Sequence, residues 1–172
     1  MNLQTERLIL RPLESADTPA LHAMMRDPEV MAFWDVPEIE DAGLVSAILD
    51  GQLRDMERGA ALYWAITARA GGGFVGCCDL SEIDRWHLRA EVGFMIDKPW
   101  WGGGYAFEAM RAVIDEAASE LGLKRLTARV HVGNDRSERL LARLDFQDEG
   151  VLRGYIQRAG ERRDCRMFGR LL

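Results

Sequence analysis

Residues 89–121 place an alternating strand, three consecutive glycines and an amphipathic helix in direct succession. The strand pattern covers 89–97, the glycines stand at 102–104, and apolar residues then recur at helical spacing, which predicts a helix over about 104–121. The first N–H groups of a helix lack internal partners and attract negative charge. Glycine lets a ligand approach the main chain closely. The segment therefore predicts a phosphate or diphosphate site, with a merely flexible turn as the alternative.

Two common nucleotide motifs do not fit these glycines. A P-loop needs a lysine and a hydroxyl residue after its last glycine, but Tyr105 and Ala106 follow here. A dinucleotide-binding turn needs a third glycine where Phe107 stands, and it belongs to an opening βαβ unit and not to mid-chain. The diphosphate would therefore belong to another class of ligand.

The remaining pattern predicts one α/β domain with a mixed sheet, spanning residues 1–172. Residues 27–38 read as a loop or short turn, and two antiparallel strands are expected around the turn RAGE near the C-terminus. The other expected strands are 3–13, 61–69, 74–83, 89–97 and 123–132, and the other expected helices are 15–26, 39–57 and 135–144.

Composition excludes several classes of protein. The net charge of −6 argues against a protein held to nucleic acid or to an anionic membrane by bulk charge. The sequence has no apolar run long enough for a transmembrane helix. Three cysteines without a framework spacing indicate reduced thiols in a cytoplasmic protein, and the dispersed histidines predict no metal site: Cys77, Cys78, Cys165, His22, His87 and His131.

Four segments carry a resemblance to a known family. They are TERLILRPLESAD (5–17), RDPEVMAFW (26–34), AEVGFMIDKPWWGGGYAFEAMRAVIDEA (90–117) and VHVGNDRSERLLARLDFQDEGVLRG (130–154). In this order and at these separations, they resemble the GCN5-related N-acetyltransferase (GNAT) family, in the branch of the ribosomal-protein N-terminal (RimJ/RimL-type) acetyltransferases. The resemblance covers nearly the whole chain.

The resemblance implies a specific fold. It is an α/β (α+β) fold with a central mixed, mostly antiparallel twisted sheet of six or seven strands and about four flanking helices. Two of the strands splay apart and form a cleft for acetyl-CoA, the acetyl donor. Backbone groups around Phe94, Met95 and Ile96 would pair with the pantetheine arm as a missing strand would.

The resemblance also places the diphosphate of acetyl-CoA. The family's motif falls on Trp101, Gly102, Gly103, Gly104, Tyr105 and Ala106, and amides from about Gly102 to Phe107 would hold the diphosphate. Gly104 and Ala106 match the motif, whereas Trp101 replaces its basic or amide residue. Relatives often carry a lysine or arginine where Gly103 stands. The sequence therefore predicts binding by the main chain, without help from a basic side chain at this position.

Asn134 and Ser137 open the expected helix 135–144. Taken alone, these residues indicate helix capping. In the family the matching asparagine bonds the pantetheine region, and the matching serine lies near the thioester sulfur. The resemblance thus implies that Asn134 binds acetyl-CoA and that Ser137 also protonates the leaving thiolate.

Glu91 is the preferred candidate for the base that deprotonates the acceptor amine, because it lies on the strand that lines the cleft. The alternative is a structural ion pair with Arg129, and Asp79 is a weaker candidate. Some relatives carry a glutamate on the strand after the serine helix. Ile156 stands at the matching position here, a departure from the ribosomal-protein enzymes.

The expected activity is acetyl transfer from acetyl-CoA directly to a primary amine, such as a protein or peptide N-terminal α-amine. Trp34 and Trp86, in irregular segments, are candidates for contacts with the acceptor, whereas Trp64 reads as core. A small-molecule or amino-acid acceptor is the main alternative. The rivals from other classes are a non-catalytic acyl-CoA-binding module and a dinucleotide-binding protein. The resemblance also allows a homodimer, and no metal is implied.

Overall fold

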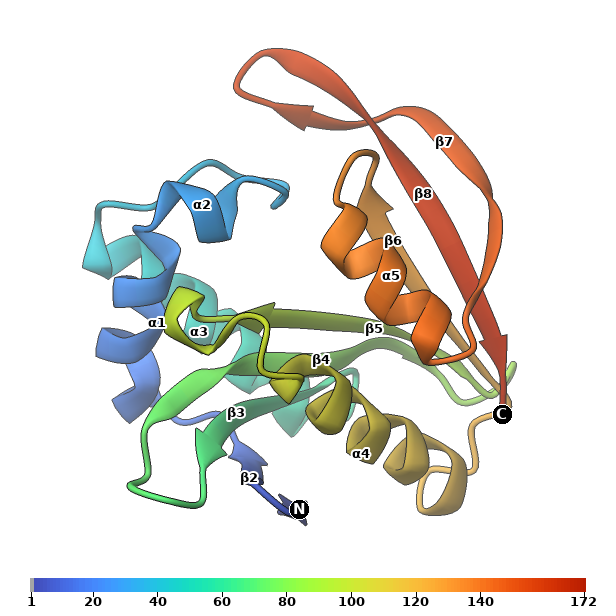
Figure 1. Cartoon of the computed structure of the whole chain (residues 1–172), viewed down its shortest axis with the longest axis horizontal. Coiled ribbons are helices and arrows are strands. Elements are labelled where there is room, and N and C mark those ends of the chain that lie inside the picture. Colours follow the sequence, from blue (N-terminus) through green and yellow to red (C-terminus); the bar gives the residue numbers. More distant parts are fainter. Residues whose placement is uncertain (1) are drawn as a thin grey trace.

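The computed structural model of the chain describes residues 2–172, and these residues form one eight-stranded sheet (Figure 1). The strand order is β1-β2-β3-β4-β5-β6-β8-β7. All neighbours pair antiparallel except β5 and β6, which are parallel. The strands are β1 (Leu3–Gln4), β2 (Leu8–Pro12), β3 (Leu62–Ala68), β4 (Phe74–Asp84), β5 (Arg89–Ile96), β6 (Arg125–His131), β7 (Gln147–Arg158) and β8 (Glu161–Leu171).

The helices follow the predicted pattern closely. Local capping explains several of their starts: the Asp41 side chain accepts the Gly43 N–H at the start of α3, and Asp27 accepts the Glu29 N–H at the start of α2. The short helix α2 lies in the segment predicted as a loop or turn. The α-helices are α1 (Thr18–Met25), α2 (Pro28–Met31), α3 (Ala42–Glu57), α4 (Tyr105–Ser119) and α5 (Asp135–Arg143), with 3-10 turns at Ser15–Asp17 and Lys98–Trp100.

The predicted fold class is confirmed, although the sheet has eight strands where six or seven were expected. The difference comes from the N-terminus, where the expected strand 3–13 folds back on itself. Thr5 donates its N–H to the Leu8 carbonyl at 3.0 Å, and this turn separates β1 from β2. None of the helices formed by residues 2–172 combines the length and the apolar composition that a membrane span requires.

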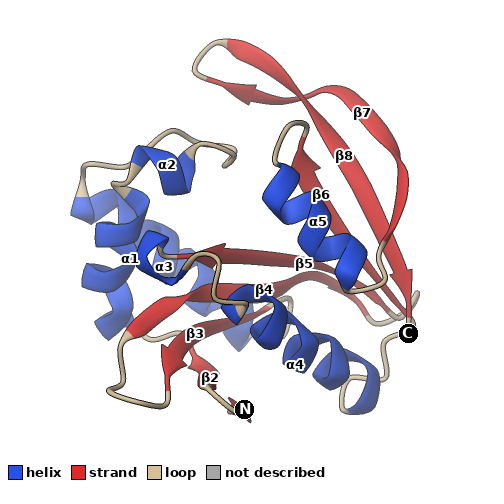
Figure 2. Ribbon diagram, in the orientation of Figure 1, coloured by secondary structure: helices blue, strands red, loops and turns tan. Residues whose placement is uncertain are grey.

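Two apolar layers cover the two faces of the sheet. Strand β3 shows how the alternation works, because Trp64 and Ile66 enter one layer and Ala65 enters the other. The first layer lies under α4 and α5, and the second lies under α1 and α3. Figure 2 shows α4 in front of the strands and α3 behind them. Trp64 is only 2% exposed, as its alternating strand predicted.

The sheet opens between β5 and β6. These strands pair at only three positions, from Arg89 opposite Arg125 to Glu91 opposite Thr127. Beyond Glu91, β5 continues to Ile96 and β6 to His131 without further pairing, and Figure 1 shows the two strands diverging. On its other side β5 stays paired with β4 as far as Ile96. The predicted splayed pair is therefore present, with one edge of β5 free of a neighbouring strand.

Candidate active site

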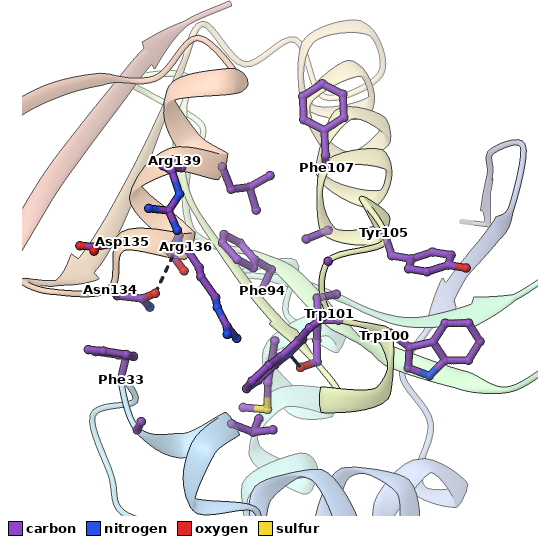
Figure 3. Close-up of a pocket in the computed structure, with 18 of the residues that line it drawn as sticks. Phe33, Phe94, Trp100, Trp101, Tyr105, Phe107, Asn134, Asp135, Arg136 and Arg139 are labelled. Atoms are coloured by element: carbon purple, nitrogen blue, oxygen red, sulfur yellow. Dashed lines mark hydrogen bonds between the residues drawn. The ribbon is translucent and has the colours of Figure 1, made fainter.

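A cleft of about 610 Å³ lies where β5 and β6 diverge. Its wall comes from the end of β5, the turn before α4, the start of α5 and the segment after α2. It includes most of the residues that the sequence assigned to the cosubstrate (Figure 3). These are Phe94, Met95, Ile96, Trp101, Gly102, Gly104, Tyr105, Ala106, Phe107, Asn134 and Ser137. Chain segments far apart in sequence thus build one continuous cavity.

The turn before α4 leaves a row of main-chain donors open. Gly102 and Gly104 both have a φ of +78°, a conformation that favours glycine, and Gly104 caps the helix without a side chain. The first bond of α4 runs from the Glu108 N–H to the Gly104 carbonyl at 3.1 Å. Within residues 2–172, no N–H group from 102 to 107 donates a hydrogen bond. These N–H groups can therefore bind an anion.

Gly103 has a different role from its two neighbours. It does not line the cleft, and a Cβ atom on it would lie 2.6 Å from the Tyr105 ring. Its carbonyl accepts a hydrogen bond from Arg7 Nη1 at 2.9 Å, and the Arg7 guanidinium stacks 4.3 Å from the Tyr105 ring centre. Trp100 meets the same ring edge-on at 5.1 Å. Gly103 is therefore small because of packing within the protein.

Trp101 fastens the turn to β5. Its indole Nε1 donates to the Ile96 carbonyl at 2.7 Å, so this carbonyl already has a partner. Met95 is buried against the layer of α1 and α3. Of the three residues expected to pair with the pantetheine arm, Phe94 lines both this cleft and a smaller neighbouring cavity.

Three arginines of α5 face the glycine turn across the cleft. Arg136, Arg139 and Arg143 all line it. The Arg136 guanidinium stacks 4.5 Å from the Trp101 ring centre, and Arg143 stacks 4.6 Å from the Phe107 ring centre. Figure 3 shows Arg136 extending from α5 toward Trp101. Sequence reasoning missed this positive wall, although the spacing of the three residues places them on one helical face.

Asn134 and Ser137 form the cap of α5. The Asn134 side-chain oxygen accepts the Ser137 N–H at 3.2 Å, which is the capping role that these residue types favour. The Ser137 hydroxyl is not needed for this bond, because the cap uses the backbone. Both side chains also line the cleft. Capping and a role in the site are thus compatible at these two positions.

A second cavity of about 300 Å³ adjoins the cleft. The two cavities meet at the splay of β5 and β6, where they share Phe33, Trp34, Phe94, Asn134 and Ser137. Beyond this junction the second cavity runs along the β3, β4, β5 and β6 side chains, including Tyr63, Asp79, Ser81, Glu91, Arg129 and His131. A donor in the cleft and an acceptor in the second cavity would approach each other at this junction.

Glu91 is engaged in an ion pair. Arg129 Nε lies 2.8 Å and 3.1 Å from the two Glu91 carboxylate oxygens, so the structural alternative considered for Glu91 is present. Burial raises the pKa of the Glu91 carboxyl, although the Arg129 guanidinium opposes the rise. Using Glu91 as a base would leave Arg129 without its charged partner.

The two tryptophans expected at the acceptor lie in different places. Trp34 lines both cavities. Trp86 lines neither, and its side chain is 87% exposed in the turn between β4 and β5. An irregular segment is equally able to put an aromatic side chain into solvent, and the structure places Trp86 away from the site. The cysteines are free thiols, and among residues 2–172 no group of three or more metal-ligating side chains is present.

The comparisons with known proteins agree with this geometry. Residues 7–147 match the acetyltransferase (GNAT) domain model, so the chain belongs to the GNAT acetyltransferase family and is an acyltransferase. It is 34% identical to the uncharacterized N-acetyltransferase p20 of Bacillus licheniformis, over 98% of this chain and 95% of the relative. It is 27% identical to spermidine N(1)-acetyltransferase of Escherichia coli K12, over 83% of this chain and 74% of that enzyme.

A solved structure shares the whole fold. The RimL ribosomal L7/L12 alpha-N-protein acetyltransferase in complex with coenzyme A superposes with a TM-score of 0.91, covering 100% of this chain and 98% of that one. The sequence identity is 20%, so this likeness concerns the fold. The resemblance to the family read from the sequence is thereby confirmed.

Proposed function

We propose that this N-acetyltransferase takes acetyl-CoA as its donor and transfers the acetyl group directly to a primary amine. The observation that carries the proposal is the junction of the two cavities at Phe94 and Ser137. The cleft offers backbone N–H groups and arginines to a diphosphate. The second cavity gives an acceptor its own way to the junction. Direct transfer needs both substrates at one place at one time.

The cleft supports the donor half of the proposal. The open N–H groups of residues 102–107 and the positive dipole end of α4 suit a diphosphate. Arg136, Arg139 and Arg143 add positive charge from the opposite wall. The unpaired edge of β5 after Glu91 could accept the pantetheine arm, and Asn134 lies beside its path. The thioester would then lie near Ser137, whose hydroxyl would protonate the leaving thiolate.

The second cavity supports the acceptor half. Two relatives illustrate two acceptor classes by their names: the spermidine N(1)-acetyltransferase of Escherichia coli, and the [ribosomal protein uS5]-alanine N-acetyltransferase of the same species. An α-amine has a pKa of roughly 7.7–8.0 and is partly neutral at neutral pH, whereas an alkyl ammonium needs stronger help to lose its proton. We favour a protein or peptide N-terminus or a small amine as acceptor, with Trp34 in contact with it.

The test is release of coenzyme A thiol from acetyl-CoA by the purified chain, with a panel of peptides, amino acids and polyamines. Mass spectrometry of the acceptor should show one added acetyl group. The Ile156 departure and the paired Glu91 motivate a second candidate, an acyl-CoA-binding module without turnover. Tight acetyl-CoA binding with no acceptor-dependent thiol release would favour that module. Competition by NAD would point instead to a dinucleotide site.

A further inference from the structure

Asp79 lies over the backbone of β5. In the pairing of β4 with β5 it stands opposite Gly93, and in the pairing of β3 with β4 it stands opposite Tyr63. A Cβ atom placed on Gly93 would lie only 2.4 Å from Asp79 Oδ1 and 3.1 Å from Asp79 Cγ. Because Gly93 has no side chain, the Asp79 carboxylate has room at this position. This position adjoins Phe94, one of the residues at the junction of the two cavities.

Asp79 faces the second cavity without a cationic partner. Among the described residues it forms no ion pair, whereas Glu91 in the same cavity is held by Arg129. Burial raises the pKa of the Asp79 carboxyl to about 7; a hydrogen bond with Ser81 opposes the rise and the nearby charge of Glu91 adds to it. Of the two carboxylates in this cavity, Glu91 is therefore held by a cation and Asp79 is not.

We propose that Asp79 is the catalytic base of this enzyme and takes the proton from the acceptor ammonium in the second cavity. The role rests on the proposed function above. The Asp79 carboxylate accepts one proton from the ammonium and becomes a neutral acid. The amine lone pair then forms the C–N bond to the acetyl carbon, and the C–S bond breaks. The thiolate takes a proton from the Ser137 hydroxyl, and Ser137 regains one from the nitrogen of the new C–N bond, so that the amide keeps a single N–H. Asp79 later returns its own proton to solvent.

The surroundings of Asp79 suit this step. A base works best when its pKa lies near the working pH, which an ordinary aspartate does not satisfy. The groups around it are the Tyr63 phenol on β3, the half-buried Cys77 thiol on β4 and Glu91 on β5. Arg129 and His131 of β6 line the same cavity, and their carboxylate partners are Glu91 and Asp35. Burial raises the pKa of Tyr63 to about 12 and that of Cys77 to about 12, so neither competes for the proton near neutral pH.

The test compares Asp79→Asn with the wild type, using an alkyl amine acceptor whose own pKa is roughly 10. The asparagine keeps the shape of the side chain, so acetyl-CoA affinity measured by calorimetry should stay within about twofold. At pH 7 the kcat/KM for the amine should fall by at least ~100-fold. In the wild type kcat/KM should level off above a pH of about 7. In the variant it should keep rising tenfold per pH unit, because only the free amine then reacts.

Two further variants separate this role from a structural one. Asp79→Ala should regain part of its turnover when formate is added, because the emptied space can admit a small carboxylate. Glu91→Gln should keep the levelling but move it to a lower pH, because the charge that adds to the raised pKa of Asp79 is gone. A wild-type kcat/KM and pH profile in Asp79→Asn would overturn the role of Asp79 alone. A wild type that binds acetyl-CoA but acetylates no amine would overturn the proposed function, and with it this role.

Discussion

Arg7 of the N-terminal strand region holds the carbonyl of Gly103, with Nη1 at 2.9 Å from the oxygen. The same side chain also pairs with Glu108 in the first turn of α4, where Arg7 Nε lies 2.6 Å from Glu108 Oε2. Thr5 Oγ1 meets the other oxygen of Glu108 at 2.5 Å. Thr5 and Arg7, between β1 and β2, thus fix the glycine turn from outside the cleft.

Replacing Arg7 by alanine should therefore loosen the turn and weaken donor binding. We expect the KM for acetyl-CoA to rise about threefold to tenfold with little change in kcat, because the open amides lose their fixed arrangement. Steady-state kinetics measures both constants. Arg26→Ala is the matched control, since Arg26 forms an exposed ion pair with Glu40 at 3.2 Å and lines neither cavity. Equal effects of the two variants would contradict the role given to Arg7.

Gly104→Val tests the N-terminal end of α4, and Gly122→Val, beyond the C-terminal end of the same helix, is the matched control. Both glycines adopt positive φ, +78° and +65°, and a Cβ atom on either would meet no atom closer than 3.6 Å. Both variants should therefore lose stability by a similar ~1–2 kcal/mol, from backbone strain alone. Only Gly104→Val should also lose acetyl-CoA affinity, because its side chain would stand among the open amides. Thermal unfolding and calorimetry separate the two effects, and unchanged affinity in Gly104→Val would refute the diphosphate site.

Ser137→Ala tests the hydroxyl at the junction of the cavities. The cap of α5 uses the Ser137 backbone and should survive the change. We expect kcat to fall about tenfold to a hundredfold, with an unchanged KM for acetyl-CoA, if the hydroxyl protonates the thiolate. Ser119→Ala is the control, because Ser119 is exposed on α4 and donates to the Asp115 carbonyl. A Ser137→Ala variant as active as this control would reduce Ser137 to a capping residue.

Arg139→Ala tests the positive wall of α5. Its loss should lower acetyl-CoA affinity by about tenfold, the usual size for a charged hydrogen bond to phosphate. The affinity of the variant should also depend less steeply on salt, because one charge no longer contributes. Arg111→Ala, on the exposed face of α4, should change neither quantity. Titrations at two salt concentrations would decide, and parallel salt curves for Arg139→Ala and the wild type would contradict the proposal.

Stability should depend on pH through Asp79. Its pKa lies near 7 in the folded chain and at the usual ~3.9 when unfolded, so folding favours the protonated form. Stability from this group is therefore lost as the pH rises from about 4 to 7 and stays level above that range. Asp79→Asn should gain thermal stability over the wild type at pH 8 and show little gain at pH 4. A gain that is equal at both pH values would contradict the raised pKa.

The elements that the sequence predicted are those with strong local patterns. The apolar period of residues 104–121 predicted α4 (Tyr105–Ser119) almost to its ends, and the alternation of 123–132 predicted β6 (Arg125–His131). Such periods fix which face is buried, and tertiary packing then only selects the partner. The glycine turn could be predicted equally well, because few other contexts need consecutive glycines at the start of a helix.

The site beyond that turn could be predicted only in part. Asp79 gains its position from the register of β4 against β5, which a single sequence does not specify. In the sequence, the arginines of α5 resemble ordinary surface residues. Only the divergence of β5 and β6 places them opposite the glycine turn. Trp86 lies in a turn without a period, so nothing in the sequence distinguished a solvent-facing ring from one in a cavity. Long-range pairing, and not local propensity, decided all three.

The strand order β6-β8-β7 has a consequence for how the site comes into being. β8 is last in sequence but lies between two earlier strands, and β6 and β7 have no pairing with each other. The wall that carries Asn134 and Ser137 follows β6 directly, and Glu138 of α5 pairs with Arg166 of β8, a strand that begins about 30 residues after β6 ends. A growing chain can therefore form the glycine turn and the pairing of β4 with β5 before the opposite wall, which needs β8. Assembly of the reactive junction is thereby coupled to completion of the sheet.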